Sequence, residues 1–239
     1  MMFEKINLFD CDIYSGAKAT LVEKIKKDIS EGKRNVVFAI NPLKVILAKE
    51  DINIKTVLQN ADVLIPDGAG IIYSAKRKRQ HIEERITGID LMNDICKMAA
   101  DTKTSIFIYG AVQENLEKAV KNLKKLYDGI NIAGYINGYE NDIEYVNKKI
   151  KESKAEILFV ACGSPMQELY IDANKDKLND VKLFMGVGGS VDVMSGNVKR
   201  APEWVIKINL EWLYRIIFQP RRLSHIKKLI EFICINKKL

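Results

Sequence analysis

Histidine and cysteine are scarce in this sequence, and their positions argue against several kinds of site. The 239 residues include only two histidines, His81 and His225, and neither lies near a cluster of cysteines or carboxylates. The four cysteines are scattered with no C-x-x-C pair, which fits neither a zinc site nor a disulfide framework. The sequence also lacks a G-x-S-x-G motif, which disfavours nucleophilic hydrolase chemistry. A D-x-D pair at 10–12 can in principle hold a metal, but it precedes the first clear strand, and we interpret it as accidental.

Long apolar runs are missing as well. No segment approaches the roughly 18 consecutive apolar residues of a membrane span, and the first residues lack the basic start and apolar stretch of a signal peptide. These absences predict a protein that stays in the cytoplasm. A chain of 239 residues, 47% of them hydrophobic, can form one sizeable α/β core with a small appendage, but two large domains are not expected.

The positive charge of the chain is concentrated at its C-terminal end. The net charge is +7, and the segment from Lys199 to Leu239 has ten Lys or Arg against three Glu, which accounts for the whole excess. The same segment contains both tryptophans, Trp204 and Trp212. Basic and apolar residues mixed in this way are typical of an amphipathic helix on an anionic membrane surface. Two alternatives are nucleic-acid binding and a helix that packs its apolar face on the core.

In the rest of the chain, short apolar segments alternate with helical patterns. This alternation is typical of βαβ units around a mainly parallel sheet with helices on both faces, which is a Rossmann-like α/β fold. The composition shifts only near residue 195. We therefore predict a Rossmann-like catalytic core over residues 1–195 and a small, basic, amphipathic helical appendage over residues 196–239. Strands are expected at 35–41, 61–68, 105–110, near 130–138, at 157–163 and within 182–193.

Nearly every predicted strand ends in a glycine or a polar residue directly before a helix. In open parallel sheets, ligands bind at the carboxyl ends of the strands, where helix N-termini suit a phosphate. We therefore expect Asp67, Gly110, Gly163 and the 186–189 loop to converge on one site. Neither G-x-G-x-x-G nor G-x-x-x-x-G-K-[ST] occurs, so a classical dehydrogenase or a P-loop nucleotidase is disfavoured. Asp67 can cap a helix and face this site at the same time.

Four stretches occur in an informative order, namely I-P-D-G-A-G-I, E-R-I-T-G-I-D-L, C-G-S-P-M-Q-E and a long block from M-G-V-G-G to Q-P-R-R. Together they resemble the WecG/TagA/CpsF family of bacterial glycosyltransferases, from about residue 3 to at least residue 228. Its members transfer a sugar from a UDP-sugar, with inversion, to a polyprenyl-diphosphate-linked acceptor at the cytoplasmic membrane face. The resemblance implies these two substrates and the membrane surface as partners, a role in teichoic acid or other surface polysaccharide synthesis, and no cofactor.

The resemblance also implies roles for single residues. An inverting transfer needs a base for the acceptor hydroxyl and charge stabilisation for the departing diphosphate. In the family pattern, Asp67 is the candidate base and Asn41 lies beside the sugar or the acceptor. Arg215 and Arg222 close over the diphosphate in place of a metal ion. Arginine suits this task because its planar fork can pair with phosphate through two hydrogen bonds and keeps its charge.

Further positions match the family pattern. By the resemblance, the 186–189 turn contacts the nucleotide and Tyr139 covers the uracil, although an ordinary loop tyrosine is the alternative for Tyr139. Arg85 and Asp90 either contact ligand or form a structural ion pair at a helix start, and Asp192 has the same ambiguity. The expected substrate-binding residues are Arg85, Gly88, Asp90, Gly110, Tyr139, Gln167, Glu168, Gly186, Gly188, Gly189, Arg215 and Arg222.

The sequence departs from the family pattern at several positions. Where many members have threonine, lysine, glutamate and arginine, this chain has Ala39, Met166, Gln219 and His225. The expected site therefore loses a hydroxyl and some positive charge. This loss is compatible with a different donor sugar or acceptor, with lower activity, or with compensation by Arg221 and Lys227.

Two functions of different classes follow. The first is a peripheral membrane glycosyltransferase that moves an N-acetylmannosamine-like or other hexose derivative, with no nucleic acid as partner. The second is a non-catalytic nucleotide or nucleic-acid binding protein on the same fold. Exposed Trp and Ile side chains in the appendage need a lipid or protein surface to cover them. A homo-oligomer in solution that dissociates on the membrane is compatible with that need.

Overall fold

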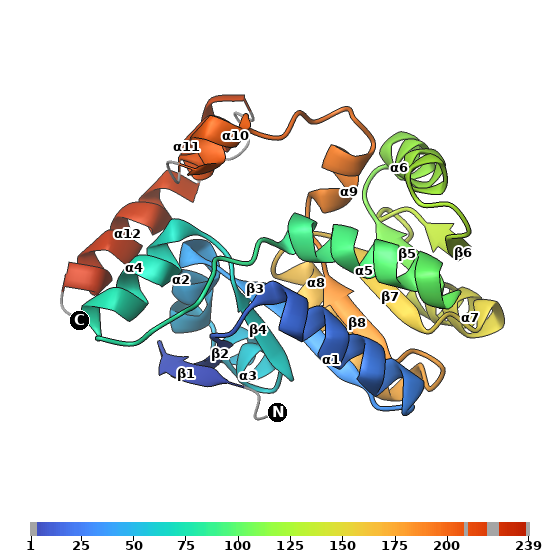
Figure 1. The fold of residues 1–239 in the computed structure, drawn as a ribbon, viewed down its shortest axis with the longest axis horizontal. Helices are drawn as coiled ribbons and strands as arrows, with labels where there is room; N and C mark the ends of the chain where they lie inside the picture. Colours follow the sequence, from blue (N-terminus) through green and yellow to red (C-terminus); the bar gives the residue numbers. More distant parts are fainter. Residues whose placement is uncertain (1–3, 208–209, 219–224, 238–239) are drawn as a thin grey trace.

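A twisted sheet of eight strands lies at the centre of the computed structural model, which describes residues 4–207, 210–218 and 225–237 (Figure 1). The strand order is β1-β2-β4-β3-β8-β7-β5-β6, and only β1 runs antiparallel to its neighbour. The predicted Rossmann-like, mainly parallel α/β fold is confirmed. The strands are β1 (Lys5–Leu8), β2 (Cys11–Tyr14), β3 (Asn35–Ile40), β4 (Val63–Pro66), β5 (Ser105–Gly110), β6 (Asn131–Ile136), β7 (Ile157–Ala161) and β8 (Leu183–Gly186).

Helices cover both faces of the sheet, as the alternating pattern predicted (Figure 1). The first helices along the chain are α1 (Lys18–Ser30), α2 (Pro42–Glu50), α3 (Ile52–Gln59), α4 (Ala69–Arg77), α5 (Gly88–Thr102) and α6 (Gln113–Leu126). They are followed by α7 (Ile143–Ser153), α8 (Met166–Asn174), a short 3-10 turn at Lys175–Lys177, α9 (Ser190–Met194), α10 (Glu203–Lys207), α11 (Glu211–Phe218) and α12 (His225–Lys237). Below, α10, α11 and α12 are called the C-terminal helices.

The hydrophobic core consists of two buried clusters, one on each face of the sheet. Strand β3 shows how they arise, because all six of its residues are buried and their side chains alternate between the faces. Val37 and Ala39 join the cluster beneath α1, α5, α6 and α9, whereas Phe38 joins the cluster beneath α2, α3, α7 and α8. A strand buried on both faces reads as a continuous apolar run, which is why the sequence indicated it clearly.

Two features of the sheet differ from the sequence-based prediction. The β1–β2 hairpin was not indicated, because each strand has only four residues and alternates over one or two apolar positions. The segment 182–193 forms a strand only over Leu183–Gly186, and then turns into the short helix α9. The glycines of that segment therefore lie in the turn between strand and helix, at the carboxyl end of β8.

The last helix, α12, packs against the core beside α2 and α4 (Figure 1). Its Phe232 is 2% exposed and belongs to the buried cluster on that face. The ring fits because residue 70 is glycine: a Cβ atom there would lie 2.9 Å from Cε1 of Phe232 and 2.7 Å from Cγ of Pro42. On the surface, Lys49 pairs with Glu231 at 2.9 Å. The C-terminal segment thus shares a core cluster with residues that extend from Leu8 to Phe184.

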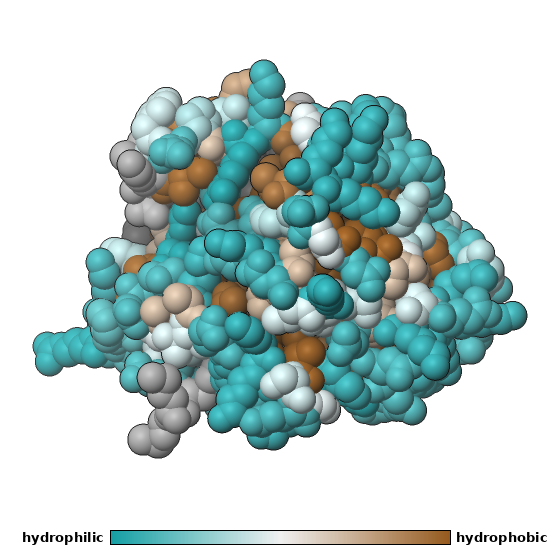
Figure 2. Space-filling view, turned by 45° about the vertical axis from the view of Figure 1, so that its right-hand side comes forward, coloured by the Kyte–Doolittle hydropathy of each residue, from teal (hydrophilic) through white to brown (hydrophobic). Residues whose placement is uncertain are grey.

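The outer surface of the C-terminal helices carries exposed apolar side chains. They are Trp204, Trp212, Leu213, Ile217, Phe218, Ile230 and Ile233, and Leu210, directly before α11, is exposed as well. Other apolar residues reach the surface as patches between hydrophilic ones, as the face shown in Figure 2 illustrates. Within residues 4–207, 210–218 and 225–237, no helix combines the length and the apolar character that a membrane crossing requires.

Candidate active site

The two candidate catalytic residues follow neighbouring strands of the sheet. Asn41 comes directly after β3 and Asp67 directly after β4, and these strands are parallel and paired. The backbone N–H of Asp67 donates to the carbonyl oxygen of Ile40 at 2.8 Å, which extends the pairing of β4 with β3 and sets Asp67 beside the residue that precedes Asn41. Because the carboxyl ends of parallel strands lie at one edge of a sheet, Asp67 and Asn41 share the edge at which ligands bind in this fold class.

Asn41 is held by the helix that it begins. Its side-chain oxygen Oδ1 accepts a hydrogen bond from the backbone N–H of Lys44 at 3.0 Å, and Pro42 occupies the first helical position. This is a standard N-cap arrangement, in which the asparagine oxygen satisfies one of the N–H groups left unpaired at the start of a helix. The cap fixes the position of the Asn41 side chain at the end of β3.

A buried ion pair lies behind Asn41. The ammonium nitrogen Nζ of Lys44 is 2.6 Å from Oε1 of Glu168, and their side chains are only 5% and 1% exposed. Burial by itself would raise the pKa of Glu168, but the charge and the hydrogen bond of Lys44 outweigh it and hold that pKa below its ordinary value. Glu168 is therefore ionised. Lys44 was not indicated by the sequence, because a lysine in the first turn of a helix normally extends into solvent.

Glu168 continues into a chain of hydrogen bonds. Nε2 of Gln167 donates to Oε1 of Glu168 at 2.8 Å, and Oε1 of Gln167 accepts from the backbone N–H of Gly188 at 2.8 Å. The structure thus brings together three residues predicted to bind substrate, and it buries both Gln167 and Glu168 among protein atoms. Their described hydrogen bonds go to other residues of the same site.

Two of the expected glycines are required by close approach of neighbouring protein atoms. At Gly110 the backbone φ is +131°, and a Cβ atom would lie 2.4 Å from the backbone carbon of Ala161 on the adjacent strand β7. At Gly186 a Cβ atom would lie 2.7 Å from Nε2 of Gln167. Gly189 precedes α9, and Gly88 is the first residue of α5 with open space at its Cβ position.

Asp90 is bound by a residue of the segment that leads to the C-terminal helices. Arg200 pairs with both of its carboxylate oxygens, Nη1 with Oδ1 at 2.7 Å and Nη2 with Oδ2 at 2.8 Å. The Thr87 hydroxyl also donates to Asp90 at 2.6 Å and caps α5. Partial burial would raise the pKa of Asp90, but these hydrogen bonds lower it below the ordinary value. Asp90 therefore forms an ion pair, and its partner is Arg200 rather than Arg85; whether it also contacts a ligand stays a prediction.

Arg85 faces the C-terminal helices as well. Its Nη2 atom lies 3.8 Å from Oε2 of Glu211 at the start of α11, and the two side chains are 16% and 11% exposed. The hydrogen bonds to Asp90 raise the pKa of Arg200, and the negative charges of Glu211 and Asp67 add to that effect. Arg200 thus interacts electrostatically with both the candidate base and α11, and Arg85 pairs with α11. Arg200 and Glu211 were assigned no role from the sequence: both lie in the long block that carries the family resemblance, but their partners Asp90 and Arg85 are far away along the chain.

Other predicted residues lie farther away or outside the description. Tyr139 is 71% exposed in the loop after β6, the outermost strand, at the opposite end of the sheet edge from Asp67. Asp192 accepts a hydrogen bond from Asn115 at 2.6 Å, which joins α9 to α6. Arg215 is part of α11, but its side chain is not described, and Arg222 lies outside the described residues. Their roles remain predictions.

The described residues contain no group of three or more His, Cys, Asp or Glu placed to hold a metal ion. The D-x-D pair at 10–12 is divided between two other contacts. Asp10 pairs with Lys55 at 2.7 Å, and Asp12 accepts a hydrogen bond from Asn7 at 2.9 Å. Both aspartates lie on the β1–β2 hairpin, at the edge of the sheet.

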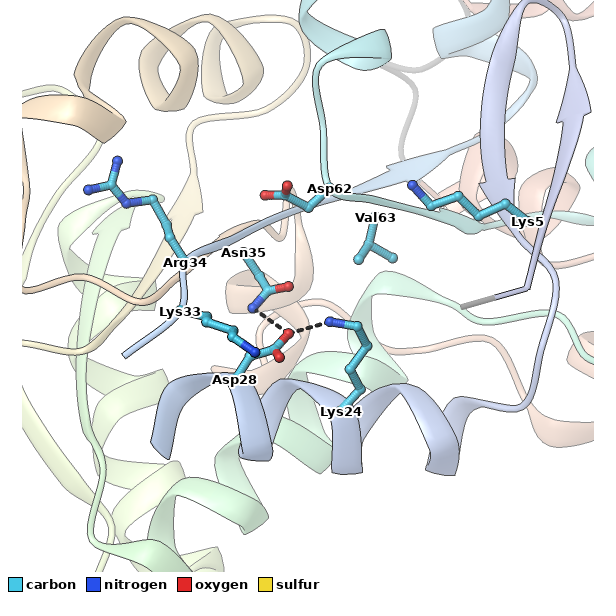
Figure 3. A pocket seen from close by; sticks show the side chains of 8 residues that line it. All are labelled: Lys5, Lys24, Asp28, Lys33, Arg34, Asn35, Asp62 and Val63. Carbon is cyan, nitrogen blue, oxygen red and sulfur yellow. Dashed lines mark hydrogen bonds and ion pairs between the residues drawn. The ribbon is translucent and has the colours of Figure 1, made fainter. Parts of the chain in front are cut away.

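A surface cavity of 530 Å³ lies at the opposite edge of the sheet, where β3 and β4 begin (Figure 3). Its charges are balanced locally: Asp28 accepts hydrogen bonds from Lys24 and from Asn35, and Arg34 pairs with Asp176 at 2.8 Å. The lining residues are Lys5, Lys24, Asp28, Lys33, Arg34, Asn35, Asp62 and Val63. Because ligands of this fold class bind at the carboxyl ends, we do not assign this cavity to the candidate active site.

Comparison with known proteins identifies relatives of this chain. A sequence model described as "Glycosyl transferase WecG/TagA/CpsF family" matches residues 6–235. The N-acetylglucosaminyldiphosphoundecaprenol N-acetyl-beta-D-mannosaminyltransferase of Bacillus subtilis strain 168 is 37% identical over 187 residues, which cover 78% of this chain and 73% of the relative. The protein of the same name from Staphylococcus aureus strain NCTC 8325 is 30% identical over 227 residues, which cover 94% and 89% of the two chains.

Proposed function

This chain belongs to the WecG/TagA/CpsF family of glycosyl transferases, and from that membership we propose that it transfers a hexose derivative, such as N-acetylmannosamine, from a UDP-sugar to a polyprenyl-diphosphate-linked saccharide. The names of the relatives support an acceptor of the N-acetylglucosaminyl-diphosphoundecaprenol type. The observation that carries the proposal is the position of Asp67 and Asn41 at the carboxyl ends of the paired strands β4 and β3, where the Asp67 N–H donates to Ile40.

The proposed reaction is a single displacement at the anomeric carbon. The acceptor hydroxyl oxygen attacks that carbon, the bond from the carbon to the diphosphate oxygen breaks, and UDP leaves with the bonding electrons. Asp67 takes the proton of the acceptor hydroxyl as general base. Asn41, whose side chain is fixed by its helix cap, orients the acceptor or the sugar. Inversion follows because attack and departure occur on opposite faces of the carbon.

We further propose that arginine side chains, rather than a metal ion, stabilise the charge on the departing UDP. Arg200 interacts electrostatically with Asp67 and with Glu211, and Arg85 lies 3.8 Å from Glu211, which makes both candidates for this task. Arg215 and Arg222 are the further candidates from the family pattern. Guanidinium groups can pair with phosphate oxygens through two hydrogen bonds, which suits a diphosphate leaving group.

The C-terminal helices are proposed to bind the inner face of the membrane, where a polyprenyl acceptor resides. Exposed Trp204, Trp212, Ile217 and Phe218 next to an excess of Lys and Arg support this placement. In this proposal, residues 1–195 form the catalytic core and residues 196–239 form the membrane-binding segment. Self-association of the same apolar surface in the absence of lipid would give an oligomer that dissociates on the membrane.

The base assignment is tested with Asp67→Asn, which keeps the shape of the side chain and removes its proton affinity. We expect a loss of about 100-fold or more in kcat, because general base catalysis typically contributes 10²–10⁴-fold, with UDP affinity unchanged. Turnover by a short-chain GlcNAc-diphospho-lipid assay and calorimetric UDP binding measure the two quantities. Unchanged turnover would reject Asp67 as the base.

The substrates are tested with a panel of UDP-sugars against the same short-chain acceptor, with and without EDTA and added Mg²⁺. Transfer from one UDP-sugar that is insensitive to EDTA is the expected result. An absolute requirement for added divalent metal would contradict the arginine assignment. UDP binding without transfer from any donor in the panel would favour a non-catalytic nucleotide-binding protein.

Membrane binding is tested with vesicles that contain anionic lipid, by comparing wild type with a Trp212→Ser, Ile217→Ser double variant. We expect the variant to bind at least about tenfold more weakly, because each exposed apolar side chain contributes of the order of 1.5–3 kcal/mol when buried in lipid. Binding by wild type should also weaken with added salt. Equal binding by the two proteins would show that these side chains do not contact lipid.

A further inference from the structure

Lys44 is an unusual residue because it is a lysine inside the protein. It occupies the first turn of α2, three positions after Asn41, and only 4% of the residue is exposed. Lysine is almost never fully buried unless it is paired, since removing an ammonium group from water is costly. A buried charge at the edge of a candidate active site calls for a reason beyond packing, and the partners of Lys44 suggest one.

The partners of Lys44 form a continuous path along the sheet edge. Lys44, on the helix after β3, pairs with Glu168 at 2.6 Å. Glu168 accepts a hydrogen bond from Gln167 at 2.8 Å, and these two residues belong to the helix after β7. Gln167 then accepts the backbone N–H of Gly188, in the turn after β8, at 2.8 Å. Since β3, β8 and β7 are neighbours in the sheet, the path joins the carboxyl ends of three adjacent strands.

The charge of Glu168 determines which way the Gln167 carboxamide points. An ionised carboxylate can only accept hydrogen bonds, so the NH₂ end of the carboxamide must face Glu168 and its oxygen must face the N–H of Gly188. A protonated Glu168 could instead donate to the Gln167 oxygen. The carboxamide would then turn its NH₂ end toward Gly188, and two donors would face each other.

Lys44 supplies the positive charge that keeps Glu168 ionised in this buried position. The oxygen of Gln167 is the described acceptor of the Gly188 N–H, so a rotated carboxamide would break that hydrogen bond. Gln167 also lies close to Gly186, where an added Cβ atom would be 2.7 Å from Nε2. The conformation of the turn thus depends on the orientation of Gln167. That orientation depends in turn on a lysine that makes no contact with the turn in the described hydrogen bonds and ion pairs.

We propose that Lys44 is a positioning residue for sugar transfer, which acts through Glu168 and Gln167 to hold the 186–189 turn in the conformation that binds the donor nucleotide. The inference rests on the proposed function, in which that turn contacts the nucleotide. Lys44 itself does not touch substrate. Its positive charge keeps Glu168 ionised, and the ionised Glu168 in turn orients the neutral carboxamide of Gln167.

The test removes the charge without leaving one partner unpaired. A Lys44→Met, Glu168→Gln double variant has a neutral pair at this place, and the new glutamine can either accept from Gln167 or donate to it. The charge of residue 168 then no longer enforces the orientation of Gln167, and only the Gly188 N–H still favours it. The matched control is Lys49→Met on the same helix, whose ion pair with Glu231 is on the surface and away from the path. Thermal unfolding first establishes that both variants are folded.

Two measurements separate positioning from a merely structural role. In protein labelled with ¹⁵N-glycine, we expect the Gly188 amide of the double variant to shift and to exchange with solvent at least about tenfold faster, while glycines remote from the path are unchanged. In steady-state kinetics we expect kcat/KM for the UDP-sugar to fall by about 10–100-fold, mostly through KM, because a misplaced binding element acts on the donor. The control should match wild type in both.

An unchanged Gly188 amide, or a change in kcat/KM of less than about threefold, would overturn the proposal. If the double variant does not fold, Lys44→Arg gives a second test, because it keeps the positive charge. It should preserve the Gly188 amide exchange and the donor KM, and a loss of either in a folded protein would overturn the proposal. If wild type transfers no sugar, the proposed function fails, but the Gly188 amide still reports whether Lys44 positions the turn.

Discussion

The candidate active site and the C-terminal helices use charge in opposite ways. At the carboxyl edge of the sheet, Lys44 and Glu168 are buried and paired with each other. On the C-terminal helices, basic residues exceed acidic ones and lie among exposed apolar side chains. A buried pair fixes geometry because neither partner can leave without exposing a bare charge to a low-dielectric interior. An exposed basic surface fixes no geometry and instead attracts an anionic surface from solution.

Helix α2 contains both situations within two turns. The Lys44 side chain is 5% exposed and bound to Glu168, whereas the Lys49 side chain is 59% exposed and bound to Glu231 of α12. The two ion pairs have similar N–O distances, 2.6 Å and 2.9 Å, yet they are expected to respond very differently to mutation. Distance alone therefore says little about what an ion pair does, and burial decides.

The largest difference between the buried and the exposed ion pair is expected for the single substitution Lys44→Met. It leaves Glu168 charged and unpaired in the interior, and we expect the free energy of unfolding to fall by about 3–5 kcal/mol. Urea unfolding monitored by circular dichroism measures the change. Adding Glu168→Leu should recover most of this loss, because the buried charge is then gone. A loss below about 1 kcal/mol for the single variant would mean that the pair is hydrated and not truly buried.

The next largest effect is expected at Phe232, which belongs to α12 but packs in the core. Phe232→Ala should lower the free energy of unfolding by about 3 kcal/mol, since it removes a fully buried ring and leaves a cavity. The matched control is Phe218→Ala, which removes an exposed ring of the same size from α11 and should have little effect. Equal, small losses for both variants would show that α12 does not contribute to the core in solution.

An intermediate effect with a definite pH dependence is expected at Asp90. Its pKa is lowered in the folded protein, so its pairing with Arg200 stabilises the fold above the unfolded-state pKa of about 3.9 and is lost as the pH falls through the folded-state value. The difference in unfolding free energy between wild type and Asp90→Asn should be constant between about pH 5 and about pH 7, and it should shrink below about pH 4. A difference that grows toward acid pH would contradict the assignment.

The smallest effect is expected for Lys49→Met. An exposed ion pair contributes about 0–1 kcal/mol to the free energy of unfolding. Salt at about 0.5 M should screen the two charges and remove most of this contribution. Urea unfolding at low and high salt measures both quantities. The same salt change should alter the effect of Lys44→Met much less, because a buried pair is poorly screened. If salt changed the effects of Lys49→Met and Lys44→Met equally, the Lys44–Glu168 pair would be as exposed to solvent as the Lys49–Glu231 pair.

Much of the fold could be predicted because its strands are continuous apolar runs. The run from Asn35 to Ile40 and the run from Ser105 to Gly110 were placed closely, and each is bounded by a helix start. The position of Asp67 followed from the same reasoning, since a polar residue after a parallel strand lies at the ligand-binding edge, whereas Asn41 was singled out by the family resemblance. Local sequence contains that information.

The partners of these residues could not be predicted in the same way. Arg200 meets Asp90 across 110 positions of sequence, and Glu211 meets Arg85 across a comparable interval, so no local pattern records either pair. In the sequence, Lys44 cannot be distinguished from a surface lysine, because its partner Glu168 is brought to it only by folding. The sequence thus indicates which residues reach the sheet edge, whereas their pairing depends on how distant helices dock against it.

Gly70 belongs to the same V-L-I-P-D-G-A-G stretch as Asp67, and its missing side chain sets a condition on how this chain can change. A Cβ atom at residue 70 would meet both Pro42 and Phe232, so the helix after β3, the helix after β4 and the last helix of the chain share one point of contact. Any methyl group gained there has to be matched by lost volume on two other helices. Residues 42, 70 and 232 are therefore expected to vary together among descendants of this sequence, although the first and the last are separated by roughly two hundred positions.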